Sequence, residues 1–189
     1  MTSLFHFIFE LIKITILGFF YATILIFIFR IVSKYRPNEY YKKMLHPKRR
    51  LWFYISLILF VFMFTPYGSH GLGDSARIPI SFTQEISNID WTEYGTVEGI
   101  ISSEGNKIET TKFKVADNKL CGNFDSGFYD YEKSHFIFDL KSNKITEFNS
   151  EVEYNEYAQK QNLPNSQQLL SFEKNYRNYW SGWRFWLLP

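Results

Sequence analysis

The sequence predicts a membrane protein with two transmembrane α-helices and a small α+β domain, in which an antiparallel sheet of five or six strands precedes two helices. Three observations predict this fold class. Two strongly apolar runs lie within the first 67 residues, a basic segment separates them, and short β-branched and aromatic runs with turn signals follow. We therefore expect a membrane anchor over residues 1–67 and an extracytoplasmic α+β domain over residues 68–189.

The first apolar run is long enough to cross a bilayer. Ile14 to Val32 contains one charged residue, Arg30, and about twenty apolar residues span the hydrocarbon core. We expect this transmembrane helix over about residues 11–33. Just upstream, Glu10 and Lys13 stand three residues apart, so the two side chains share a helical face and are predicted to pair at the membrane interface.

The second apolar run, from Leu51 to Phe64, is shorter, and its flanks identify it as a membrane span. Lys48, Arg49 and Arg50 stand immediately before it, and Trp52 lies at its entrance. Cations and indole rings at the end of an apolar run are typical of interfacial anchors. We expect the second helix over about residues 50–67, with these four residues as its topology anchors.

The charge of the intervening segment predicts the orientation. Its eight cations oppose a single acid, Glu39, and loops rich in Lys and Arg stay in the cytoplasm. The prediction is therefore a two-pass protein of the bacterial inner (cytoplasmic) membrane, with both termini extracytoplasmic and the lipid bilayer as one partner. The frequent Phe, Ile, Asn and Lys residues suggest a bacterial source with low GC content. The cations are Arg30, Lys34, Arg36, Lys42, Lys43, Lys48, Arg49 and Arg50.

The net charge of +2 is a sum of two opposed halves. Residues 1–65 carry nine Lys and Arg against two acids, which gives +7, whereas residues 66–189 carry twelve against seventeen, which gives −5. The positive charge lies between two apolar runs, so nucleic acid is not an expected partner. Cys121 is the single cysteine, so no disulfide can form within the chain.

The remainder of the chain has the alternation and turn residues of an antiparallel sheet, followed by helical spacing. Ser150 and Glu153 form a capping box that predicts a helix ending near Leu163, and an apolar stripe predicts a second helix from Ser166 to about Trp180. The predicted strands are one around Ile78–Phe82, then Thr96–Ser102, Ile108–Val115, Lys119–Gly122, Ser134–Leu140 and Lys144–Phe148.

The aromatic end of the chain is the candidate binding site. Trp180, Trp183 and Trp186 are spaced three apart, and Arg184 is available for cation–π contacts. Two interpretations remain open. The rings either complete a small core without disulfides, or insert into the outer membrane interface or a protein groove.

No residue pattern predicts catalysis, and no cofactor or metal is expected. Ser75 lacks the spaced Asp and His partners of a serine nucleophile. His70 and His135 have no neighbouring His or Cys at metal-ligand spacing, while His6 and His46 lie in the anchor. A phosphate-binding glycine loop is also missing from the sequence.

The leading functional hypothesis is therefore a non-enzymatic accessory or recognition protein, anchored in the membrane, that binds another membrane or envelope protein. One alternative is an envelope hydrolase or transferase that uses a loop with His70, Asp74 and Ser75. A second alternative is a membrane immunity protein that binds a toxin, because small two-span proteins with an acidic domain suit that role.

Overall fold

The computed structural model describes residues 2–35, 48–90, 92–125 and 129–189. The chain divides into two compact units. The helix unit comprises Met1–Gly73 together with Gly182–Pro189, and the β domain comprises Asp74–Ser181. The middle of the predicted basic loop, with Arg36, Glu39, Lys42, Lys43 and His46, lies outside the described residues.

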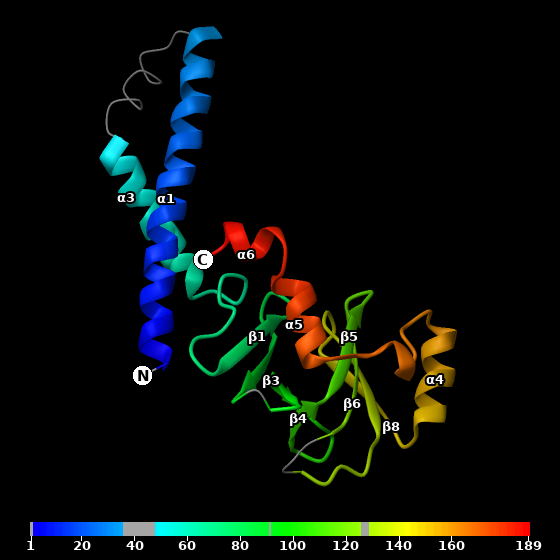
Figure 1. The fold of residues 1–189 in the computed structure, drawn as a ribbon. Helices are drawn as coiled ribbons and strands as arrows, with labels where there is room; N and C mark the ends of the chain where they lie inside the picture. Colours follow the sequence, from blue (N-terminus) through cyan, green and yellow to red (C-terminus); the bar gives the residue numbers. More distant parts are fainter. Residues whose placement is uncertain (1, 36–47, 91, 126–128) are drawn as a thin grey trace. The chain divides into compact units, whose positions relative to one another are not determined.

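Two apolar helices, α1 (Thr2–Tyr35) and α3 (Lys48–Met63), form most of the helix unit and run in opposite directions (Figure 1). Within the described residues, α1 alone is long and apolar enough to cross a membrane, as judged by length and composition. At 1.5 Å per residue it is about 51 Å long, which exceeds a hydrocarbon core of about 30 Å. The 16 residues of α3 extend for about 24 Å.

Small residues bring α1 and α3 together. A β-carbon at Gly18 would overlap the side chain of Ser56 on α3, and Ala22, one turn further along α1, is buried. Trp52 of α3 donates its indole N–H to the carbonyl oxygen of Thr15, 3.2 Å away. Close approach at small residues is the usual packing mode of apolar helices, because it maximises van der Waals contact.

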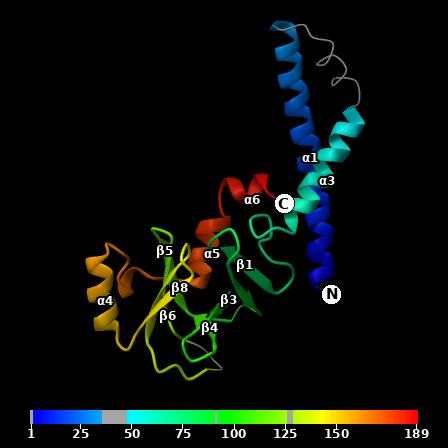
Figure 2. The same cartoon turned by 180° about the vertical axis from the view of Figure 1, so that it is seen from behind.

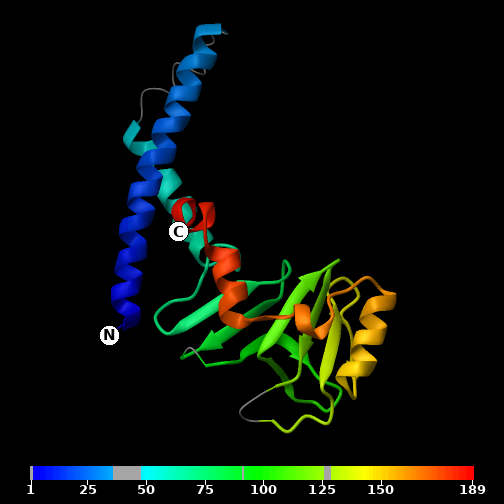
Figure 3. The same ribbon diagram turned by 45° about the vertical axis from the view of Figure 1, so that its right-hand side comes forward.

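The β domain contains two antiparallel sheets (Figure 3). The strand orders are β1-β2-β3-β4 and β8-β7-β6-β5-β9, so consecutive strands up to β8 form a meander that changes sheet between β4 and β5. The strands are β1 (Ser75–Pro79), β2 (Glu85–Ile89), β3 (Gly95–Ile101), β4 (Lys107–Thr110), β5 (Lys112–Ala116), β6 (Lys119–Asn123), β7 (His135–Asp139), β8 (Lys144–Phe148) and β9 (Leu170–Ser171).

Asn123 stabilises the corner at which the chain leaves one sheet for the other. Its Oδ1 accepts hydrogen bonds from the backbone N–H of Lys112 at 2.8 Å and from the hydroxyl of Thr110 at 3.0 Å. Its Nδ2 donates to Oγ1 of Thr111 at 2.9 Å. The corner formed by Thr110, Thr111 and Lys112 therefore has side-chain partners in place of the sheet hydrogen bonds that are interrupted there.

The two faces of the larger sheet contact two separate cores. On β7, Phe136 and Phe138 face the core shared by both sheets, whereas Ile137 between them faces a second core with Cys121 and Tyr154. This alternation follows from the two-residue period of a strand. Helix α4 (Glu151–Lys160) covers the second core and is seen from behind in Figure 2.

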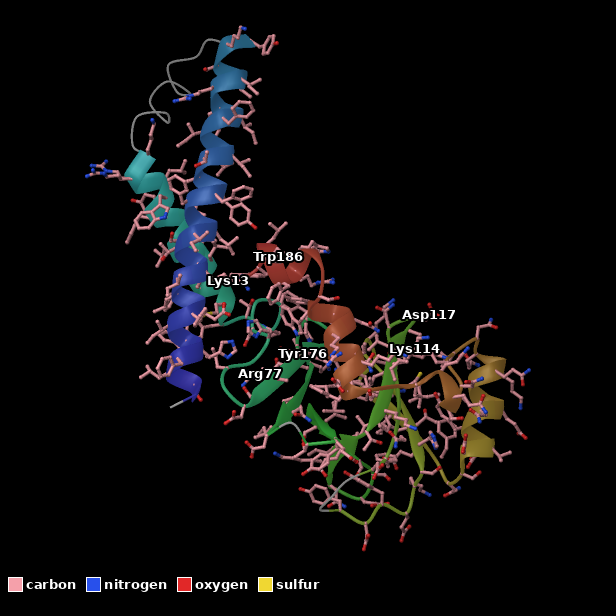
Figure 4. The ribbon with its side chains drawn as sticks, viewed as in Figure 1. Lys13, Arg77, Lys114, Asp117, Tyr176 and Trp186 are labelled. Carbon is pink, nitrogen blue, oxygen red and sulfur yellow. The ribbon has the colours of Figure 1, made fainter. Side chains whose placement is uncertain are left out.

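Helix α5 (Phe172–Trp180) packs against β1 and β5. Trp180 donates its indole N–H to the carbonyl oxygen of Arg77 at 2.6 Å, and Asn175 donates to that of Phe113 at 2.8 Å. Figure 4 labels Tyr176 on this helix and Arg77 on β1. Through these bonds α5 contacts one strand of each sheet.

The predicted long apolar helix and antiparallel sheet domain with helices are confirmed, but the predicted strand count is too low. Nine strands in two sheets occur among the described residues. The predicted strand Ile108–Val115 is two strands, because the chain turns at Thr111. The strand β2 was not predicted, because the buried polar side chains of Ser87 and Asn88 interrupt its apolar pattern.

The predicted helix after Ser150 is confirmed, and the next one begins later than predicted. Oγ of Ser150 accepts from the backbone N–H of Glu153 at 3.3 Å, which is one half of the predicted capping box. The carboxylate of Glu153 accepts from the backbone N–H of Asn149 at 2.9 Å and not from that of Ser150. The predicted helix from Ser166 instead starts with the 3-10 turn η1 (Ser166–Gln168) and the strand β9. Leu170 pairs with Phe113, so this segment is extended until Ser171 caps α5.

Candidate functional site

The structure separates the predicted aromatic binding residues. Trp180 is buried in the β domain, whereas Trp183 and Trp186 belong to the short helix α6 (Trp183–Leu187) of the helix unit and are 59% and 71% exposed. The guanidinium of Arg184 lies 4.9 Å from the centre of the Trp183 ring. The exposed aromatic surface is therefore formed by α6 without Trp180.

Helix α6 lies beside α1 within the helix unit. Tyr21 of α1 donates its hydroxyl to the carbonyl oxygen of Leu187 at 2.5 Å, and Nζ of Lys13 lies 5.3 Å from the centre of the Phe185 ring. Figure 4 labels Lys13 on α1 and Trp186 on α6. Helix α6 and the residues after it therefore pack beside the part of α1 between Lys13 and Tyr21.

The predicted topology anchors lie in the first turns of α3. Lys48, Arg49 and Arg50 are exposed, and Trp52 is half-buried. The indole N–H of Trp52 donates its hydrogen bond to the carbonyl oxygen of Thr15 on α1. The three cations therefore form a charged end on an otherwise apolar helix.

The residues of the hydrolase alternative belong to different units. His70 is part of the helix unit, whereas Asp74 and Ser75 begin the β domain. His135 is half-buried and stacks on Tyr154 with 4.8 Å between ring centres. Burial lowers the pKa of His135 below its usual value, and Glu151 opposes that shift. The stacking gives His135 a packing role.

A cluster that the sequence analysis did not predict lies at the start of α1. His6 and Glu10 are four residues apart and share one face of the helix. After α3 the chain returns to this face through a glycine-rich segment. Gly71 and Gly73 have φ of 106° and 69°, and a β-carbon at Gly73 would overlap the side chain of Ser3. These glycines let the segment approach α1 closely enough for His70 to meet Glu10.

Three side chains form this cluster, which we call the His-Glu-His cluster: His6, Glu10 and His70. Nε2 of His70 lies 3.1 Å from Oε1 of Glu10, and Nε2 of His6 lies 3.7 Å from the same oxygen. The centres of the two imidazole rings are 5.2 Å apart. One ligand atom from each side chain falls within 4.8 Å of the others.

The carboxylate of Glu10 is enclosed. The residue is 6% exposed, and its Oε2 has no hydrogen-bond partner among the residues that the structure describes. A buried carboxylate with an unsatisfied oxygen is costly unless an opposite charge or a hydrogen-bond donor compensates it. The chemistry open to the cluster is therefore the binding of a cation or of protons.

The backbone sets the tautomer of His6. Gly73 donates its N–H to Nδ1 of His6 at 3.0 Å, so neutral His6 carries its proton on Nε2, facing Glu10. From sequence alone, Glu10 is predicted to pair with Lys13, and His6 is assigned only to the membrane anchor. The four-residue spacing of His6 and Glu10 was the one sequence signal for this cluster. Its third member, His70, could not be identified from spacing, because it lies 60 residues from Glu10 along the chain.

Exposed apolar side chains gather at one end of the smaller sheet. Phe82, in the turn between β1 and β2, is 82% exposed, and Ile101, at the end of β3, is 61% exposed. The strand register places both at the same end of the sheet, while Ile89 lies at the other. An open groove at this end is lined by residues that include Gln84, Gly99, Ile101, Asn143 and Ile145.

A comparison of the chain with protein-family models, with curated proteins and with solved structures finds no match.

Proposed function

We propose that this chain is a non-enzymatic recognition protein of a bacterial envelope complex, anchored in the inner membrane by α1 and α3. The observation that carries the proposal is the surface of α1. Large apolar side chains such as Phe9, Phe19 and Phe27 are mostly exposed on it. A helix that is apolar on all sides needs lipid or protein around it. A lipid bilayer covers about 30 Å of this surface.

A second span formed by α3 is supported by its composition and length. Phe53, Ile58 and Val61 are exposed, and the cations Lys48 to Arg50 lie at its first turn. Its length of about 24 Å is short of the hydrocarbon core, and a short span is accommodated by local thinning of the bilayer and by snorkelling of flanking cations. The cation-rich end belongs on the cytoplasmic side.

The His-Glu-His cluster supports a hairpin of two spans. His6 and Glu10 precede the most apolar part of α1, and His70 follows α3. These side chains meet because α3 returns the chain to the side from which α1 started, as two consecutive spans do. The same side then carries both termini and the β domain.

The aromatic helix α6 supports placement of this end of the hairpin at the outer membrane interface. Trp183 and Trp186 are exposed, and α6 contacts α1 at Lys13, just before the apolar run, and at Tyr21 within it. Tryptophan is enriched at the interface because an indole ring combines an apolar body with a polar N–H. Of the two interpretations of this segment, the interfacial anchor is the one we adopt.

The recognition surface that we assign is the exposed apolar end of the smaller sheet. Ile101 lines an open groove, and Phe82 lies at the same end of the sheet. Exposed apolar side chains near a groove are common in protein-binding sites. The partner we expect is another membrane or envelope protein.

Affinity purification from detergent-solubilised membranes of the source bacterium tests the proposal. The tagged wild-type chain should recover a stoichiometric partner, and Phe82→Ser with Ile101→Ser should lose it. Ile89→Ser is the matched control, because Ile89 is 63% exposed at the opposite end of the sheet, and it should retain the partner. Recovery of the wild-type chain alone, or equal recovery by all three chains, would contradict the assignment.

A further inference from the structure

We propose that the His-Glu-His cluster binds a divalent transition-metal ion of the zinc class, at the point where the chain returns to the start of α1. His6, Glu10 and His70 supply two imidazole nitrogens and one carboxylate oxygen, all within 4.8 Å of one another. Three protein ligands of this type, with the fourth position open, form a common zinc site.

The distances suit a metal centre. In a tetrahedral site with zinc–ligand bonds of about 2.0–2.1 Å, neighbouring ligand atoms are about 3.3 Å apart. The distances from Oε1 of Glu10 to Nε2 of His70 and Nε2 of His6 are 3.1 and 3.7 Å. Binding therefore needs modest movement of these side chains.

The buried carboxylate of Glu10 supplies the second, independent observation. Its Oε2 has no hydrogen-bond partner within the described part of the chain, although Glu10 is 94% buried. A dication would compensate this charge, which otherwise is stabilised by the contact with His70, by the charge of Lys13 and by His6. Two nitrogen donors disfavour Ca²⁺ and Mg²⁺, which prefer oxygen ligands, and favour Zn²⁺ and its neighbours in the first transition row.

Metal binding would change the tautomer of His6, and this change gives the proposal a specific, measurable consequence. An ion bound to Nε2 of neutral His6 requires its proton on Nδ1, where Gly73 now donates its N–H. The proton moves from Nε2 to Nδ1 as the ion binds, and the Gly73 hydrogen bond is lost. Metal binding is therefore coupled to the backbone of the glycine-rich segment, and this coupling can be measured at a single amide.

Zinc titration of the full chain in detergent micelles, after removal of metals with EDTA, tests the site. We expect one Zn²⁺ per chain for wild type and at least a tenfold weaker affinity for H6Q, E10Q and H70Q. H135Q is the matched control, because His135 packs in the β domain outside the cluster, and it should bind as wild type does. Each variant is first checked for native far-UV circular dichroism.

A spectroscopic readout separates the site from adventitious binding. The chain has ten glycines, so selective ¹⁵N-glycine labelling gives a simple amide spectrum in which Gly73 should shift on addition of Zn²⁺ while Gly105 stays. Absence of zinc binding by wild type, or undiminished binding by H6Q, E10Q and H70Q, would overturn the proposal. The proposed recognition of a partner is tested separately at Phe82 and Ile101, so either proposal can fail alone.

Discussion

At the scale of single residues, Cys121 shows how the β domain is stabilised without a disulfide. It is fully buried on β6, in the core that α4 covers, together with Ile137 and Tyr154. Burial raises the pKa of its thiol from 9.0 to about 11. The thiol therefore acts as a small apolar core group, and a disulfide between chains would require this core to open.

Native Cys121 should react very slowly with iodoacetamide. With the pKa raised to about 11, the thiolate fraction at pH 8 falls about 100-fold, and burial slows access further. The measurement is the labelling rate of the full chain in detergent, by mass spectrometry, with and without denaturant. A control chain with C121S and S142C, whose new thiol replaces an exposed side chain, should label fast in both conditions. Fast labelling of the native wild-type chain would contradict the buried position.

At the scale of elements, the contact between α1 and α3 depends on small side chains. Gly18 faces Ser56 so closely that an added β-carbon would overlap it, and Ala22 continues the same buried stripe. Large side chains there would force the helices apart. The exposed positions of α1, which include most of its large apolar residues, tolerate bulk.

Gly18→Val should destabilise the helix pair. Overpacking of a close contact typically costs about 1–3 kcal/mol, so we expect a lower melting temperature of the full chain in detergent, followed by far-UV circular dichroism. Ile16→Phe is the matched control, because it also adds bulk to α1 but at an exposed position, and it should melt as wild type does. Equal melting of the two variants would show that the helices do not pack at Gly18.

Two elements of the β domain differ in how well the local sequence predicts them. The Ser150 cap of α4 was predictable, because the hydroxyl and the backbone N–H that it accepts from belong to residues three apart. The break between β4 and β5 was not, because the β-branched residues Thr110 and Thr111 favour an extended strand. The side chain that supports the corner, Asn123, comes from another strand. Tertiary contacts overrode the local strand propensity there.

At the scale of the whole molecule, the distribution of charge sets the predicted topology. The segment between the apolar helices is rich in cations and the rest of the chain is mildly acidic. Cations near span ends resist translocation, so this segment should face the cytoplasm and both termini the outside. The proposed partner and the metal-binding cluster would then both lie outside the cytoplasm.

Reporter fusions in bacteria test this topology. Alkaline phosphatase fused after Pro189 should be active, because it matures outside the cytoplasm, and green fluorescent protein inserted between residues 36 and 47 should fluoresce. Replacing Lys48, Arg49 and Arg50 by glutamine should reduce the phosphatase signal, because the orientation bias weakens. A C-terminal reporter that works only in the cytoplasm would contradict the topology.

The sequence by itself determined the features that depend on neighbouring residues. These are the long apolar helix, most of the antiparallel strands, the capped helix α4 and the absence of an internal disulfide. The tertiary structure decided the division into two sheets, the exposure of Trp183 and Trp186, and the meeting of His70 with Glu10. Spacing along the chain specifies local hydrogen bonds and faces, whereas contacts over sixty residues depend on the path that the intervening chain takes.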